Sequence, residues 1–324
     1  MSGPHVPRSS GAHVPHSSGA HVRCAPLVPA PGPAFACSQV SRRSVRDAIR
    51  WAVGVLALSG SETPRLDAEM LLAHALSLTR VQLYIRWHDP VGPFGDQLYS
   101  SLVQRRAAHE PVAYLTGERC FYDVALYVDR RVLIPRPETE HLVEEALTWA
   151  RSRGKRAFRI ADVGTGSGVL AIVLAQHLPH AQVWAVDVSR EALGVAARNV
   201  RRYALQARVN LVCGDLLSCL RGPFDLIVAN MPYIASDALS CLPPDVVEFE
   251  PRVALDGGED GLALIRRLLA QCPDRLATPG LILLEIGDGQ GQAVCEVARR
   301  HLPHAETTVR RDYAGLERVV RVEA

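Results

Sequence analysis

Five short apolar segments between residues 158 and 287 constrain the fold of this chain most strongly. They read FRIADV, AQVWAVDV, RVNLVCGD, FDLIVAN and LILLEIG, and each is rich in leucine or β-branched residues. Stretches with helical character separate them. Apolar strands that alternate with helices are typical of a parallel sheet covered on both faces. The sequence therefore predicts an α/β domain over residues 137–324.

The segment before this domain has a different pattern. Apolar residues recur at helical spacing in two stripes, and a further helix is predicted over 95–109. The stripes are Val45, Ile49, Val53 and Leu56, then Ala68, Leu71, Leu72, Ala75 and Leu76, the second opened by Thr63 and Pro64 as cap and first-turn residue. Residues 118–136 alternate around Asp123. We predict a helical domain over 41–117 and a β-hairpin linker over 118–136.

The first 40 residues repeat with a period of eight, as GPHVPRSS, GAHVPHSS and GAHVR. A composition of Gly, Pro, Ser and His cannot build a core, so we expect a disordered tail over 1–40. No acidic residue precedes Asp47, as in organelle transit peptides. Two origins stay open for this tail, a transit peptide leading to an organelle matrix and a start codon placed too far upstream.

Composition excludes several classes of function. The formal charge is +2 and no basic block dominates a predicted domain, which argues against charge-driven binding to nucleic acid or membrane. The eight cysteines form no Cys-x-x-Cys pair, so no zinc site or redox pair is indicated, and free thiols suit a reducing cytoplasm. No apolar run reaches the length of a membrane span.

A glycine-rich loop follows the first predicted strand. Residues 164–168 read GTGSG, so Gly164, Gly166 and Gly168, with Thr165 and Ser167 between them, lie between a strand and a helix. Glycine lets this loop turn sharply and lets a ligand approach the backbone. Asp187 ends the second strand, 19 residues beyond Gly168, where a carboxylate can accept both hydroxyls of a ribose.

The spacing of the loop separates two cofactors. Dinucleotide enzymes use G-x-G-x-x-G to place a pyrophosphate at a helix N-terminus, whereas this chain has G-x-G-x-G after Asp162. An acidic residue there would repel a pyrophosphate and suits the ammonium of a methionine moiety. S-adenosyl-L-methionine is therefore favoured, with a nicotinamide dehydrogenase as an alternative. Asp215, at the third strand end, can accept from the adenine amine with Leu216 over the ring, although an isolated Asp215 could also cap a helix.

The fourth strand ends in Asn230, Met231, Pro232 and Tyr233. A planar amide or exocyclic amine is a poor nucleophile because its lone pair is delocalised, so an enzyme must grip its N–H groups and direct the lone pair at a methyl group. The Asn230 oxygen and the carbonyl of residue 231 can each accept one N–H, and Tyr233 can lie against the planar group. Pro232 holds residue 231 extended. An isolated Asn-x-Pro more commonly forms an ordinary turn.

The chain resembles the release factor glutamine methyltransferases, the PrmC/HemK group. The resemblance runs from about residue 41 to the C-terminus. It rests on the glycine loop, Asp187, Asn230 with Pro232 and Tyr233, and on the more particular segments LIPRPETE (133–140), FEPRVALDGGEDGL (249–262), LLEIG (283–287) and RDYAGLERVV (311–320). The resemblance implies a Rossmann-like class I methyltransferase fold with a mostly parallel seven-stranded sheet.

The resemblance also implies a reaction, N5-methylation of the glutamine in the Gly-Gly-Gln loop of peptide chain release factors. Asn230, Met231, Pro232 and Tyr233 would hold that amide, the helical domain would dock the release factor, and no nucleic acid, membrane or second subunit is expected. Residues 164–168, Asp187, Leu216 and Asn230 would line the cofactor pocket, and Phe121 and Arg136 would wall the active site.

One departure from the family pattern affects specificity. The family has Asn-Pro-Pro-Tyr, and here the first proline is Met231. A similar Asn-Leu-Pro-Tyr turn occurs in rRNA adenine dimethyltransferases, so an adenine N-methyltransferase acting on nucleic acid is the alternative. A module that keeps the fold without the chemistry is a third possibility.

Overall fold

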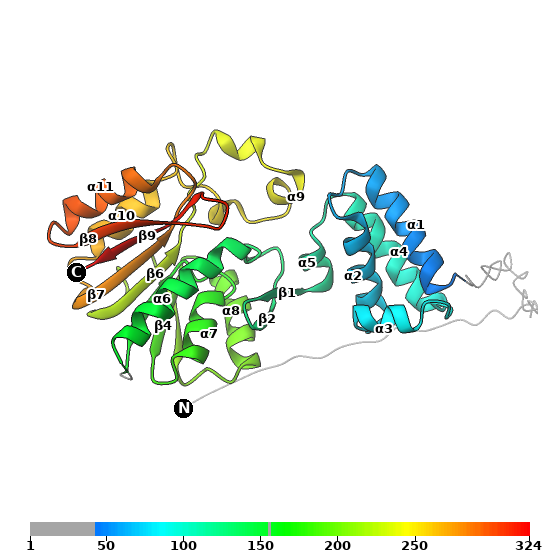
Figure 1. The fold of residues 1–324 in the computed structure, drawn as a ribbon, viewed down its shortest axis with the longest axis horizontal. Helices are drawn as coiled ribbons and strands as arrows, with labels where there is room; N and C mark the ends of the chain where they lie inside the picture. The colour runs from blue at the N-terminus through cyan, green and yellow to red at the C-terminus, as the bar shows by residue number, and fades with distance from the viewer. Residues whose placement is uncertain (1–42, 155–156) are drawn as a thin grey trace, which may run out of the picture. The chain divides into compact units, whose positions relative to one another are not determined.

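The computed structural model describes residues 43–154 and 157–324. The tail predicted over 1–40 lies outside the described residues. Helices in the first part of the described chain are α1 Val45–Leu58, α2 Pro64–Leu76, α3 Arg80–Ile85, α4 Pro93–Ala107 and α5 Val112–Thr116. Helices α1, α2 and α4 pack against one another in a bundle (Figure 1). Its core contains most of the predicted stripe residues and also Tyr99, whose hydroxyl donates to the Ala68 carbonyl.

The start of α2 differs in detail from the prediction. Pro64 occupies the first turn as expected, but the Thr63 side chain caps no backbone N–H. The Thr63 hydroxyl donates instead to Asp67, at 3.0 Å. Asp67 also forms an ion pair with Arg106 of α4, at 2.8 Å, which joins α2 to α4.

A short antiparallel hairpin follows the bundle. It consists of β1 Glu118–Phe121 and β2 Val124–Tyr127, with Phe121 opposite Val124. The strands are shorter than the predicted segment, and residues 128–136 are irregular. The Asn199 side chain accepts from the Tyr127 N–H and donates to the Tyr127 carbonyl, so the hairpin is held by a helix of the main domain instead of by further pairing.

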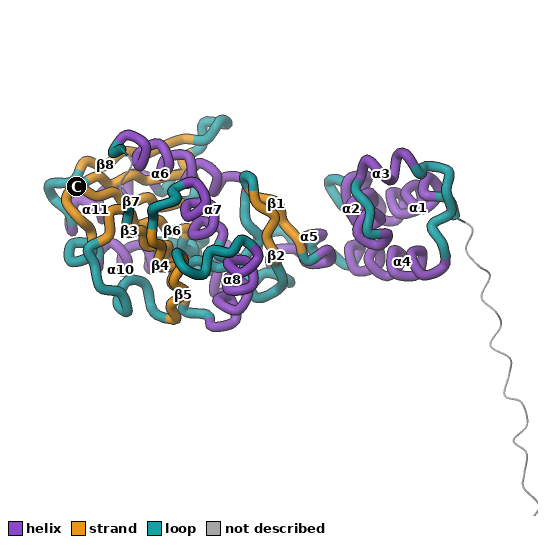
Figure 2. The backbone as a smooth tube through the Cα atoms, turned by 90° about the horizontal axis from the view of Figure 1, so that it is seen from below, coloured by secondary structure: helices purple, strands orange, loops and turns teal. Residues whose placement is uncertain are grey.

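The main domain is built on a seven-stranded sheet (Figure 2). The strands are β3 Arg159–Val163, β4 Gln182–Asp187, β5 Val209–Cys213, β6 Phe224–Asn230, β7 Leu276–Glu285, β8 Glu306–Arg311 and β9 Glu317–Glu323. Their order is β5-β4-β3-β6-β7-β9-β8. Strands β3 to β7 are parallel, and the pairs β7–β9 and β8–β9 are antiparallel. This topology confirms the predicted mostly parallel α/β fold.

Helices cover both faces of the sheet. The longer ones are α6 Glu140–Ser152, α7 Val169–His177, α8 Arg190–Arg202, α10 Ala263–Gln271 and α11 Gly291–His301; short helices are η1 Pro137–Thr139, η2 Ala238–Cys241, α9 Pro244–Val247 and η3 Arg252–Ala254. Alternate residues of each strand enter two cores. Ile160 and Leu226 face the core that α6 and α7 complete, whereas Ala161 and Ile227 face the core of α10 and α11.

Candidate active site

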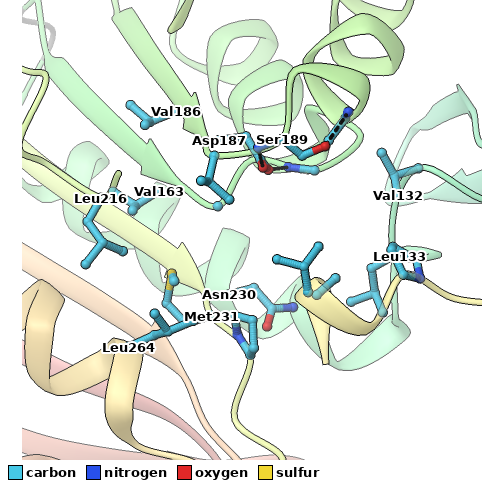
Figure 3. Close-up of a pocket in the computed structure, with 18 of the residues that line it drawn as sticks. Val132, Leu133, Val163, Val186, Asp187, Ser189, Leu216, Asn230, Met231 and Leu264 are labelled. Atoms are coloured by element: carbon cyan, nitrogen blue, oxygen red, sulfur yellow. Dashed lines mark hydrogen bonds between the residues drawn. The ribbon is translucent and has the colours of Figure 1, made fainter. Parts of the chain in front are cut away.

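Four strand ends meet at the carboxyl edge of the sheet, because β3, β4, β5 and β6 are parallel neighbours. A cavity opens there, and Figure 3 shows Asp187 and Asn230 on opposite sides of it. Its lining includes most of the predicted site residues, namely Gly164, Gly166, Asp187, Asp215, Leu216, Asn230, Met231 and Pro232. Thr165 and Ser167 line a smaller cavity that shares Gly164, Gly166 and Asn230 with the first. Tyr233 lines a third, again with Asn230.

The glycine loop turns at the end of β3. Gly164 has φ +74° and donates its backbone N–H to Val186, at 2.9 Å. A Cβ on Gly164 would lie 3.4 Å from the Met231 sulfur, so a side chain here would strain the backbone and crowd the cavity wall. A Cβ on Gly166 would meet nothing within 4 Å, which leaves the backbone at Gly166 open to a ligand.

Gly168 and Asp162 do not line these cavities. Gly168 is the N-cap of α7 with φ +84°, and a Cβ there would lie 3.3 Å from the Cβ of Ala196. Asp162 is fully buried and accepts from the Thr165 hydroxyl, at 2.6 Å, and from the Ala171 N–H, at 3.1 Å. Burial raises the pKa of Asp162 to about 7. One carboxylate oxygen thus supports the loop, the other has no hydrogen-bond partner among the described residues, and the expected contact with a cofactor ammonium stays a prediction.

Asp187 ends β4 and faces the cavity. One carboxylate oxygen accepts from the Gly166 N–H, at 2.9 Å, and the other from the Ser189 N–H, at 2.8 Å. Burial raises the pKa of Asp187, and these backbone bonds act against the rise. Because each carboxylate oxygen has two lone pairs, both can still accept a ribose hydroxyl. The arrangement suits a nucleoside whose sugar lies beside the glycine loop.

The side of the cavity beside Asp215 combines an apolar surface with an ion pair. Leu216 and Leu264 lie close to Met231 (Figure 3), which gives a planar ring an apolar surface. Asp215 is ion-paired with Arg267 of α10, and both line the cavity. An adenine amine would therefore share the Asp215 carboxylate with a guanidinium that the sequence reasoning did not identify.

Asn230 is the last residue of β6. Its Nδ2 donates to the Thr139 hydroxyl oxygen, at 3.1 Å, and its Oδ1 accepts no hydrogen bond from the residues that the structure describes. Glu285 of β7 stands directly opposite Asn230 in the sheet register. The amide of Asn230 is thus tied at its nitrogen and free at its oxygen, as a hydrogen-bond acceptor for a substrate must be.

The segment that follows Asn230 is held from behind by residues 257–261 and 287–290. Gln290 donates its Nε2 to the Tyr233 carbonyl, at 2.9 Å, and the Gly257 N–H donates to the Ile234 carbonyl, at 2.8 Å. Gly261 has φ +75°, and a Cβ there would collide with the Tyr233 carbonyl oxygen. The GGEDG sequence is therefore needed to let two backbone segments approach closely.

Of the two residues that were expected to wall the site, Arg136 lines one of its cavities and Phe121 does not. Arg136 lines the cavity beside Tyr233 and is ion-paired with buried Glu250, at 2.6 Å. Phe121 is buried in the core beneath α6 and α7, so the expectation for Phe121 is wrong.

Burial raises the pKa of Tyr233 to about 12, which keeps its hydroxyl protonated near neutral pH.

Comparisons with known proteins place the chain in a family. Residues 47–117 match the model described as PrmC N-terminal domain, and residues 142–242 match the model described as Methyltransferase small domain. The release factor glutamine methyltransferase of Moorella thermoacetica is 46% identical over 276 residues, which are 85% of this chain and 96% of that protein. The protein of the same name from Geobacter sulfurreducens is 41% identical over 278 residues, 86% and 95% of the two chains.

The chain belongs to the release factor glutamine methyltransferase family. Membership confirms the predicted resemblance and the prediction of an S-adenosyl-L-methionine-dependent methyltransferase. The ribosomal protein L11 methylase of Lactobacillus delbrueckii subsp. bulgaricus, a solved structure, has 23% identity and a TM-score of 0.41, covering 58% of this chain and 79% of that one.

Two further findings bear on the site of this family member. Among the described residues, no group of three or more His, Cys, Asp or Glu side chains could hold a metal ion. No helix among them is long and apolar enough to cross a membrane.

Four residues on which the site depends were not predicted from the sequence: Thr139, Asn199, Arg267 and Glu285. Thr139 and Glu285 lie inside the LIPRPETE and LLEIG segments, which were noted without a role for either side chain. Asn199 donates to the Ser167 carbonyl, at 2.9 Å, and so holds the glycine loop from α8. No local pattern marks Asn199 or Arg267, because their partners are distant in sequence.

Proposed function

We propose that this protein transfers the methyl group of S-adenosyl-L-methionine to the side-chain nitrogen of the glutamine in the Gly-Gly-Gln loop of peptide chain release factors. Family membership supports the substrate, since relatives at 46% and 41% identity carry that name over nearly their whole length. The geometric observation that carries the proposal is the Asn230 amide, whose oxygen is free at the edge of the cofactor cavity while its nitrogen is bound to Thr139.

The cofactor is proposed to lie along the carboxyl edge of the sheet. Residues 164–167 would surround the methionine part, with Gly168 supporting them at the start of α7; Asp187 would accept from the ribose, and Asp215 with Leu216 would contact the adenine. The open backbone at Gly166 and the remaining lone pairs of Asp187 fit such a nucleoside. When bound, the cofactor supplies an electrophilic methyl group.

Residues 230–233 are proposed to hold the acceptor amide. The Asn230 oxygen and the Met231 carbonyl each accept one N–H, and the Tyr233 ring lies against the amide plane. This grip turns the nitrogen lone pair toward the methyl group. The bound cofactor would supply the methyl group and keep the sulfur electron pair, while residues 230–233 would hold the amide so that its nitrogen can take the methyl group and give up one of its two protons to solvent. Pro232 supports the arrangement because it keeps Met231 extended.

The remaining parts are proposed to serve docking. The helical domain over 41–117 would bind the release factor, the hairpin over 118–136 would link it to the methyltransferase domain over 137–324, and the enzyme would act as a monomer. Because its substrate works in translation termination, we place it in the cytoplasm, or in an organelle matrix if residues 1–40 are a transit peptide.

A labelled-methyl experiment tests the proposal. The protein is incubated with S-adenosyl-L-methionine carrying a labelled methyl group and either a release factor or RNA and DNA. A release factor in which the Gly-Gly-Gln glutamine is replaced by alanine is the control. Label is expected in the intact release factor alone. Label in nucleic acid and not in the release factor would reject the proposal in favour of an adenine methyltransferase.

A further inference from the structure

A buried carboxyl group stands beside the proposed gripping residue. Glu285 ends β7 and pairs in register with Asn230, the end of β6. Paired residues of neighbouring parallel strands project from the same face of the sheet, about 5 Å apart. Glu285 is only 1% exposed, and one of its oxygens, Oε2, has no hydrogen-bond partner among the described residues. A carboxyl group is costly to bury in this way, so its presence needs a reason.

Thr139 connects the two side chains. It is 2% exposed, and its hydroxyl oxygen accepts from Asn230 Nδ2. A hydroxyl that accepts in this way still has its own proton to donate. Hydrogen bonding from the Thr139 and Asn230 side chains lowers the pKa of the Glu285 carboxyl group and so favours its ionised form. When Thr139 gives its own proton to Glu285, donation runs in one direction, from Asn230 to Thr139 and from Thr139 on to Glu285.

The direction matters because the two ends of an asparagine amide are nearly equal in size and opposite in hydrogen bonding. If the Asn230 amide turned over, its NH₂ would meet the NH₂ of the acceptor and could not hold it. Thr139 alone does not prevent this, since its hydroxyl could donate to a reversed Asn230 oxygen. A carboxylate that takes the Thr139 proton removes that possibility.

We propose that Glu285 and Thr139 are positioning residues that lock the Asn230 amide with its oxygen toward the methyl acceptor. This proposal rests on the proposed function, because it assigns a purpose to the same gripping amide. Neither residue touches the reacting atoms. Both act through Asn230.

The lock depends on the ionised carboxylate. Burial raises the pKa of Glu285 to about 7, Glu138 adds to the rise, and Arg318 opposes it together with the Thr139 and Asn230 hydrogen bonds. The charge of Glu285 also raises the pKa of Tyr233, whose hydroxyl stays protonated near pH 7. A protonated Glu285 can donate to Thr139 and so reverse the direction of donation. Methyl transfer should therefore increase as the pH rises through about 7.

Three variants test the proposal by kinetics. Thr139→Val removes the hydroxyl at nearly constant volume, Thr139→Ser keeps it, and Glu285→Gln removes the charge. We expect kcat to fall about tenfold in the valine variant, as for one lost hydrogen bond, with cofactor affinity within about threefold and activity restored in the serine variant. Glu285→Gln should lower kcat at pH 8 and abolish its rise with pH. Full activity in Thr139→Val together with an unchanged pH profile in Glu285→Gln would overturn the proposal.

Nuclear magnetic resonance provides a readout that does not require any substrate. The sequence contains asparagine only at positions 199, 210 and 230. Protein labelled with ¹⁵N-asparagine therefore gives three side-chain amide signals, with Asn199, which is buried and fully hydrogen-bonded, as an internal control. The Asn230 signal should titrate near pH 7 in the wild type and not in Glu285→Gln. A signal that does not titrate in the wild type would reject the lock.

These two measurements separate failure of the inference from failure of the proposed function. If the wild type methylates no release factor, the proposed function is wrong, and the ¹⁵N titration still decides whether Glu285 orients Asn230. If the wild type does methylate release factor and the Asn230 signal ignores pH, the function stands and the lock is wrong.

Discussion

The buried Glu285 carboxyl should make the stability of this protein depend on pH in a way that one substitution removes. Its pKa in the folded protein is about 7, against 4.5 for an unperturbed glutamate. The folded state therefore holds a proton that the unfolded state has already released between these pH values. The contribution of this proton to the free energy of unfolding is fully present below pH 4.5 and is lost as the pH rises through 7.

The magnitude follows from the size of the shift. Raising the pKa from 4.5 to about 7 corresponds to a free energy of roughly 3 kcal/mol, because one pH unit is worth about 1.36 kcal/mol. Solvent screening reduces this free energy little, because the Glu285 side chain is almost fully buried. Glutamine has nearly the same shape and no titratable proton. The difference in unfolding free energy between Glu285→Gln and the wild type should therefore change by about 2 to 3 kcal/mol in favour of the variant between pH 5 and pH 8.

Urea denaturation at pH 5, 6, 7 and 8, followed by circular dichroism, measures this difference. Asp162 has its own pKa raised to about 7 by burial, so both proteins should lose some stability with rising pH. Only the difference between them reports on Glu285. A difference that stays constant within about 0.5 kcal/mol from pH 5 to pH 8 would refute the reasoning, because it would mean that Glu285 does not titrate in this window.

Other substitutions separate cofactor binding from acceptor alignment. Asn230→Ala should abolish methyl transfer while cofactor affinity, measured by calorimetry, stays within roughly tenfold, since one hydrogen bond is worth about 1 kcal/mol; equal activity would contradict the gripping role. Asp187→Asn should weaken cofactor binding by about tenfold, because the amide nitrogen cannot accept from Gly166 or Ser189; unchanged affinity would remove Asp187 from the site. Gly261→Ala should lower stability by at least about 1 kcal/mol in urea denaturation and reduce kcat, since its Cβ meets the Tyr233 carbonyl; wild-type values would show that the close approach is not needed.

Much of the fold could be predicted because it depends on local patterns. The five parallel strands are apolar runs, and β3 and β6 end at the glycine loop and at Asn230 as the sequence indicates. The two antiparallel strands were harder to identify, because β8 and β9 have many charged residues. Their place in a seven-stranded sheet was expected only from the family resemblance.

The candidate site was predictable where residues act through the backbone or through a strand end. Glycine at positive φ and a polar residue after a buried strand are both visible in sequence. The expected contact of Asp162 with a cofactor ammonium stays a prediction, because Thr165 and the first turn of α7 bind one carboxylate oxygen and the other has no partner among the described residues. The Thr139 contact with Asn230 joins residues 91 positions apart, and only the folded chain reveals it.

The three hydrogen bonds of Asn199 have a consequence for evolution and engineering of this chain. One carboxamide supports the second strand of the hairpin and the turn in front of α7 at the same time. An apolar substitution at residue 199 would remove both attachments at once. The hairpin and the loop before α7 therefore depend on the same residue. We expect substitutions that change the backbone of one segment to be tolerated only when Asn199 can still bind the other.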